Sequence, residues 1–134
     1  MAPSERPKVL ETIAARLRKT DEKIVAAYAF GSFLRPEPFR DIDIGILLAS
    51  TPSDPLQYEL ETEGVLSRHI RLPVDVRLLN QAPVSFSQAA IRGKVIVDAD
   101  PDCRSDFENR TLKHYFDFAR YRRRYLAEVR NAPV

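Results

Sequence analysis

Two apolar segments in the first third of the chain place the tightest constraint on the fold. Ile24–Phe30 is a continuous apolar run that ends at Gly31, which is the pattern of a buried strand. Residues 41–49 form a second apolar run, in which Asp41 and Asp43 alternate with isoleucines. Because side chains alternate along a strand, the two aspartates share one face and the isoleucines share the other. Without a bound cation these carboxylates would repel each other, which indicates a functional site; for such a pair alone, solvated acids at a strand end are the alternative.

The rest of the chain supplies helices and two further strands. The order α-β-β-α-β-α-β-α predicts an α/β (α+β) fold, in which a small sheet is flanked by helices. We expect one domain over residues 1–134, with Ser4 capping the first helix, Ser53 and Asp54 capping the second, and Cys103 in a turn before the last. The predicted helices cover residues 4–19, 54–69, 85–92 and 104–130, and the predicted strands cover residues 24–30, 41–49, 74–79 and 94–97.

Composition excludes several classes of protein. A hydrophobic share of 44% and a charged share of 30% are typical of a globular chain and not of a disordered one. No apolar run approaches the ~20 residues that a membrane span needs, and the first residues lack a secretion signal. A single cysteine, Cys103, allows no intrachain disulfide. We therefore expect a cytoplasmic protein that does not bind membranes.

A third carboxylate and a small-residue turn add to the acidic pair. Asp75 interrupts an apolar run, so a neighbouring strand could bring it beside the first two acids; the alternative is an ion pair with Arg77 or Arg71. At Gly31 the backbone can approach a phosphate closely, while the Ser32 hydroxyl and nearby amides can donate hydrogen bonds to it. A plain strand exit is the alternative for this turn. Together, the turn and the three acids predict metal-dependent nucleotidyl transfer.

These residues carry a family resemblance. Residues 29–35, AFGSFLR, followed by residues 40–45, RDIDIG, resemble the signature of the minimal nucleotidyltransferases of the DNA polymerase β superfamily. Within that superfamily the chain is similar to the MntA-type antitoxins that are encoded beside HEPN toxins. The resemblance implies a polymerase β-like fold with a small mixed four-stranded sheet and a long C-terminal helix. It continues through Asp75, Gly93–Val97, Asp106–Glu108 and Tyr115–Phe118.

The resemblance also implies a role for each site residue. Asp41 and Asp43 would coordinate two Mg²⁺ ions, and Asp75 would complete the metal shell and help deprotonate the attacking hydroxyl. ATP would be the substrate, pyrophosphate the leaving group, and a tyrosine of a HEPN toxin the acceptor of AMP. The implied nucleotide-binding residues are Gly31, Ser32 and Arg35.

One departure from the family pattern keeps a second hypothesis open. Eight residues separate Ser32 from Asp41, where the family usually has about ten, and Pro36 stands where a glycine is expected. The chain could therefore be a weakly active or inactive module that masks a toxin sterically. Transfer to a small molecule such as an aminoglycoside is less favoured, because no additional substrate domain is evident.

The C-terminal segment differs in charge and pattern from the rest. Residues 104–130 carry eight basic and four acidic residues, a net charge of +4, whereas the remainder has a net charge of −2. One apolar stripe on this helix is enough for docking on its own sheet, and a second predicts a partner surface for a homo- or hetero-oligomer. A helix packed deep in its own domain is the alternative, and nucleic-acid binding by residues 120–125 is disfavoured. The stripes are Leu112, Tyr115, Phe116, Ala119, Leu126 and Val129, and beside them His114, Phe118, Tyr121 and Tyr125.

Overall fold

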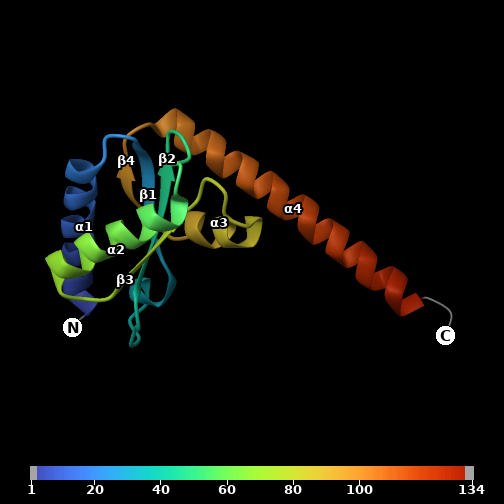
Figure 1. Cartoon of the computed structure of the whole chain (residues 1–134). Helices are drawn as coiled ribbons and strands as arrows, with labels where there is room; N and C mark the ends of the chain where they lie inside the picture. The colour runs from blue at the N-terminus through green and yellow to red at the C-terminus, as the bar shows by residue number, and fades with distance from the viewer. Residues whose placement is uncertain (1–2, 132–134) are drawn as a thin grey trace.

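A mixed four-stranded sheet lies at the centre of the fold, as predicted (Figure 1). The computed structural model describes residues 3–131. Strand β1 (Ile24–Phe30) pairs antiparallel with β2 (Ile42–Leu48) and with β4 (Lys94–Asp98), whereas β2 pairs parallel with β3 (Val74–Leu78). The strand order β3-β2-β1-β4 leaves β3 and β4 at the edges.

Helices cover both faces of this sheet. Helices α1 (Arg6–Thr20) and α2 (Pro55–Ile70) pack on one face, where their apolar residues form a core with the isoleucines of β2. Helix α3 (Val84–Ile91) and the first turns of α4 (Pro101–Asn131) pack on the other face, against Tyr28 and Leu47. Because Asp43 lies between two of the buried isoleucines, its side chain belongs to the α3 face of the sheet.

The helix starts confirm one predicted cap and correct another. The Asp54 carboxylate accepts a hydrogen bond from Gln57 N at 3.1 Å, and α2 begins at Pro55 as such a cap favours. The predicted cap at Ser4 is wrong, because this residue lies in a short 3₁₀ turn, η1 (Pro3–Glu5). Glu5 is the cap position of α1, and it makes no side-chain capping bond.

The last helix begins earlier than its hydrophobic pattern indicates. It starts at Pro101, three residues before the predicted boundary, so the expected turn at Cys103 is wrong. Asp100 Oδ1 accepts a hydrogen bond from Cys103 N at 3.1 Å, and Pro101 occupies the first helical position. An aspartate cap followed by proline is a helix-start signal, and here it also resembles a turn.

Helix α4 leaves the sheet after about three turns and projects away from the other elements (Figure 1). Phe107 and Thr111 are its buried residues, so neither apolar stripe docks on the sheet, and the prediction of a deeply packed helix is also wrong. Within residues 3–131, no helix combines the length and the apolar character that crossing a membrane requires. The exposed large apolar side chains of α4 are Leu112, Phe116, Phe118, Tyr121, Tyr125, Leu126 and Val129.

Candidate functional site

Asp43 and Asp75 lie side by side on adjacent parallel strands. They are direct register partners, and paired strands lie about 4.8 Å apart, so the two carboxyl groups emerge next to each other. Both side chains are half-buried. Asp41 precedes the first residue of β2 and is exposed at the open end of the strand. The parallel pairing of β2 with β3 is therefore what brings the sequence-predicted acids to one end of the sheet.

The environment of Asp43 disfavours its charged form. Burial raises the pKa of the Asp43 carboxyl, and the negative charges of Asp75 and Asp41 raise it further, whereas Arg77 opposes this effect. A cation bound between these groups would relieve the same repulsion, and carboxylate oxygens are the ligands that Mg²⁺ prefers. The donor set therefore fits a divalent ion chemically.

The third acid, Asp75, forms an ion pair with a residue of its own strand. Asp75 Oδ1 lies 3.4 Å from Arg77 Nε, which is one of the partners anticipated for it. Among the described residues, no three His, Cys, Asp or Glu side chains are already arranged around a common metal position. Coordination of one ion by all three acids would therefore require their side chains to move closer together.

Gly31 brings the backbone of the turn against the acidic pair. It ends β1, starts the 3₁₀ turn η2 (Gly31–Leu34), and has a φ of +81°, which favours glycine. A Cβ atom at this position would clash with Asp43 Oδ2. Conformation and contact both require glycine here, so the amides that follow lie close to the carboxylates. Ser32 is half-buried in η2, and Arg35 caps its end and pairs with Glu37 at 3.4 Å.

Arg6 holds the short loop between the turn and the acids, a role that the sequence interpretation missed. Its guanidinium is buried and donates hydrogen bonds to the carbonyl oxygens of Phe33, Arg35 and Glu37, at 3.3 Å to the first and 2.8 Å to the last. It also lies over the rings of Phe33 and Phe39, at 5.4 and 4.9 Å from their centroids. The proline-containing loop is therefore fixed by a cation from α1.

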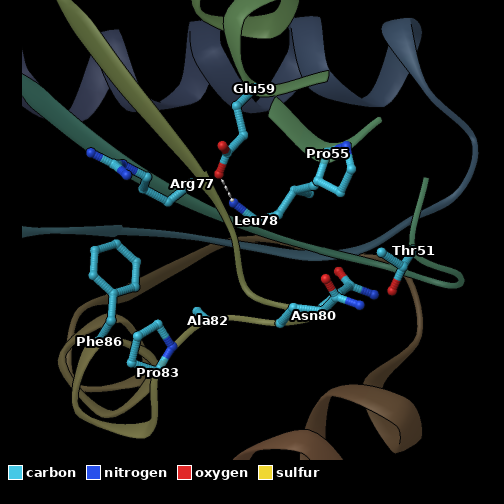
Figure 2. A pocket seen from close by; sticks show the side chains of 10 residues that line it. Thr51, Pro55, Glu59, Arg77, Leu78, Asn80, Ala82, Pro83 and Phe86 are labelled. Carbon is cyan, nitrogen blue, oxygen red and sulfur yellow. Dashed lines mark hydrogen bonds between the residues drawn. The ribbon is translucent and has the colours of Figure 1, made fainter. Parts of the chain in front are cut away.

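Helix α2 supplies a second missed feature, along the edge strand that bears Asp75. Glu59, Glu63 and Ser67 accept hydrogen bonds from the backbone amides of Leu78, Val76 and Val74 at 2.8, 2.9 and 3.2 Å. The first of these bonds is visible in Figure 2. Burial raises the pKa of the Glu63 carboxyl, and contact with Asp75 raises it further, against the opposing Val76 amide bond.

This ladder satisfies the outer amides of β3 and fixes the strand beside β2. Its only signal in the sequence is the four-residue spacing of three polar side chains on one helical face.

Two hollows flank α3 near the acids. One, of about 220 Å³, is mostly apolar and is framed by Pro55, Pro83 and Phe86, with Arg77 and Asn80 at its rim (Figure 2). The other, of about 450 Å³, begins at Gly31 and reaches the C-terminal end of α3. Phe30 and Phe86 meet edge-to-face at 5.3 Å between the two hollows. The second hollow lies closer to the predicted chemistry, because it includes the turn glycine.

Comparison with known structures finds the same fold in chains of toxin–antitoxin complexes. A chain of the tri-AMPylated Shewanella oneidensis HEPN toxin in complex with MNT antitoxin is 22% identical, with a TM-score of 0.74 over 92% of this chain and 98% of that one. A chain of the toxin–antitoxin MntA–HepT structure is 22% identical, with a TM-score of 0.73 over 92% of this chain and 97% of that one. A toxin–antitoxin structure with AMP-PNP gives 24% identity and a TM-score of 0.74 over 89% and 97%. At these identities the likeness shows a shared fold.

A family match gives the assignment. No curated protein matches the sequence significantly. The family model for polymerase beta nucleotidyltransferases, however, matches residues 11–102, which include the glycine turn and both acid-bearing strands. Because this match spans more than half of the chain, the protein belongs to the polymerase β nucleotidyltransferase family.

Proposed function

We propose that this protein is a Mg²⁺-dependent nucleotidyltransferase that transfers AMP from ATP to a tyrosine of a HEPN toxin and thereby acts as its antitoxin. The observation that carries this proposal is the pairing of Asp43 with Asp75 directly against the Gly31 turn. Family membership supports the reaction class. The similarity to chains from complexes with a tri-AMPylated HEPN toxin and with AMP-PNP supports the acceptor and the nucleotide. We place the reaction in the cytoplasm.

In this reaction, Asp75 takes the proton of the acceptor hydroxyl, and the hydroxyl oxygen attacks the α-phosphorus of ATP. A phosphorus–oxygen bond to the acceptor forms, the bond to the β-phosphate oxygen breaks, and pyrophosphate leaves. Asp41, Asp43 and Asp75 would hold the metal, which when bound neutralises phosphate charge and orients the reacting groups. The backbone of Gly31 and Ser32 would donate hydrogen bonds to phosphate oxygens.

The test of catalysis is the mass of the partner. Incubation of the HEPN protein with this chain, ATP and Mg²⁺ should add one or more AMP masses to the toxin, on a tyrosine that peptide mass spectrometry can locate. Omission of Mg²⁺ should prevent the addition. A toxin that stays unmodified in the complete mixture would contradict the catalytic proposal. If the toxin were nevertheless silenced, and calorimetry showed no Mg²⁺-dependent ATP binding, steric masking would be the function.

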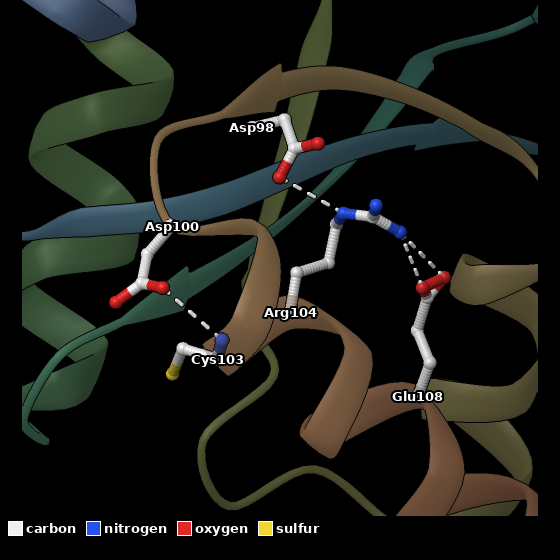
Figure 3. A network of polar contacts seen from close by, with 5 residues as sticks. All are labelled: Asp98, Asp100, Cys103, Arg104 and Glu108. Carbon is white, nitrogen blue, oxygen red and sulfur yellow. Dashed lines mark hydrogen bonds and ion pairs between the residues drawn. The ribbon is translucent and has the colours of Figure 1, made fainter.

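We further propose that the projecting half of α4 is the surface that binds the toxin. The base of the helix is fixed, because Arg104 bridges Asp98 at 2.9 Å and Glu108 at 2.7 Å, which joins α4 to the end of β4 (Figure 3). Beyond this anchor, Tyr121 is 67% exposed and Phe116 is 64% exposed. Aromatic residues and arginines are the side chains that protein interfaces favour, and α4 exposes both.

Replacing two of these aromatics tests the surface. Tyr121→Ser with Phe118→Ser should weaken toxin binding by about a hundredfold or more, since buried aromatic anchors contribute about 2 kcal/mol or more each. Calorimetric or biolayer titration with the toxin measures the effect, and thermal unfolding should be unchanged because both side chains are exposed. Ser105→Ala, on the exposed base of the same helix, serves as the control. Unchanged toxin affinity in the double variant would place the interface elsewhere.

A further inference from the structure

The hollow that begins at Gly31 has a cationic rim. Its lining combines Arg35 from the end of η2 with Gln88 and Arg92 from the end of α3, and none of its lining residues within 3–131 is a carboxylate. Its volume of about 450 Å³ exceeds by several-fold the roughly 150 Å³ that suffice for a small ring. The charge and the size of this hollow fit an anion larger than a single small ion.

Backbone packing fixes the position of Arg92 in this hollow. Arg92 caps α3, and the following residue, Gly93, sits so close to β1 that a Cβ atom there would clash with the carbonyl oxygen of Ala29 and crowd Phe30. The turn after α3 is therefore pressed against the end of β1, one residue before Gly31. This contact holds the backbone of Arg92 near the turn.

Neither Arg35 nor Arg92 forms an ion pair with a buried residue among those described. The ion pairs found within residues 3–131 do not include Arg92, and Arg35 pairs only with exposed Glu37. An arginine near a helix C-terminus is also favoured by the helix dipole, which is the ordinary explanation for Arg92. That explanation does not account for a second guanidinium and an amide around the same hollow.

We propose that Arg92, together with Gln88, binds the β- and γ-phosphates of the nucleoside triphosphate and the pyrophosphate that leaves. This inference rests on the proposed function, which places the metal at the three acids and phosphate oxygens at the backbone of Gly31 and Ser32. Because Gly31 contacts Asp43 and also opens the hollow, a triphosphate extending from the acids over the glycine enters it. A guanidinium binds phosphate oxygens through two parallel hydrogen bonds, and this geometry is what Arg92 contributes.

Calorimetric titration of Arg92→Met with Mg²⁺·ATP, pyrophosphate and AMP tests the assignment. We expect affinity for ATP and for pyrophosphate to fall by about tenfold to a hundredfold, which is the effect of losing a charge-assisted hydrogen bond. Affinity for AMP, which lacks the outer phosphates, should change less than twofold. Arg92→Lys should fall between the wild type and Arg92→Met, because it keeps the charge and loses the paired geometry.

Arg68→Met is the matched control. Arg68 is exposed in the last turn of α2, so the variant removes the same charge from a comparable helix end on the opposite face of the sheet. It should bind all three ligands like the wild type. If Arg92→Met binds ATP as tightly as the wild type does, the phosphate assignment is overturned and the proposed function stands. If the wild type itself binds no ATP, both are overturned.

Discussion

Asp43→Asn is expected to reduce AMP transfer to the toxin by about a hundredfold to a thousandfold. The substitution keeps the shape of the side chain and removes the charge that holds the metal beside Asp75, and loss of a single preorganised electrostatic group commonly costs 10²–10³ in rate. Initial rates of adduct formation at saturating ATP measure the effect. Near-wild-type transfer by this variant would show that the chemistry lies elsewhere.

The same variant should be at least as stable as the wild type at neutral pH. Burial and two neighbouring acids raise the pKa of Asp43 in the folded protein, so its ionised form opposes folding above that pKa. As the pH falls through the raised value, the native carboxyl takes up its proton before the unfolded one does, and the penalty disappears. The stability advantage of Asp43→Asn in metal-free buffer should therefore be largest at neutral pH and shrink toward pH 4.

Asp102→Asn is the control for the transfer measurement. Asp102 is exposed in the first turn of α4, which follows β4 at the end of the sheet opposite the acids. It should leave the transfer rate unchanged. A metal-free unfolding curve in which Asp43→Asn is clearly less stable than the wild type would contradict the electrostatic account of this site.

Arg6→Met is expected to lower both stability and activity. It leaves three backbone carbonyl oxygens of the loop between Ser32 and Asp41 without their donor and removes a cation that lies over two aromatic rings. We expect the free energy of unfolding to fall by about 2–4 kcal/mol, as for a buried charged group whose partners are left unpaired. Chemical denaturation measures this change, and the KM for ATP should rise because the loop no longer holds the turn against the acids.

Arg16 is an exposed arginine on the same helix, so Arg16→Met should change neither the free energy of unfolding nor the KM for ATP. Arg6→Lys separates the charge from the hydrogen bonds. Lysine keeps the positive charge but lacks the planar guanidinium whose several donors bind the three carbonyl groups. If Arg6→Met unfolded like the wild type, the loop would have to be held by its prolines alone.

The acidic constellation was readable from local sequence. Apolar runs around Asp43 and Asp75 identified two strands, and the period of two assigned the acids to one face of each strand. Strand boundaries were predicted to within about a residue because buried strands carry a continuous apolar signal. The start of α4 was misplaced because Asp100 and Pro101 suit a turn as well as a helix cap.

The long-range contacts could not be read in this way. Arg6 binds carbonyl groups 27 to 31 residues away, and the backbone that it binds leaves no mark in the side-chain pattern. In the sequence, Glu63 is indistinguishable from an exposed polar residue of α2. Its hydrogen bond with the Val76 amide exists only because β3 packs beside this helix. The expectation that one stripe of α4 docks on the sheet was wrong, because hydrophobic periodicity is the same for a helix that docks on its own sheet and for one that projects.

The sequence by itself determined the strands and most of the helices, and the acids at the strand ends, because these follow from side-chain alternation and hydrophobic periodicity. The need for glycine at the turn came from the structure, in which a Cβ atom would clash with Asp43. Tertiary structure alone decided that β2 pairs parallel with β3 in the register that joins Asp43 to Asp75. It also decided that Arg6 fixes the loop and that Arg92 borders the hollow at Gly31. These features depend on packing between segments far apart in the chain, and no local pattern encodes that packing.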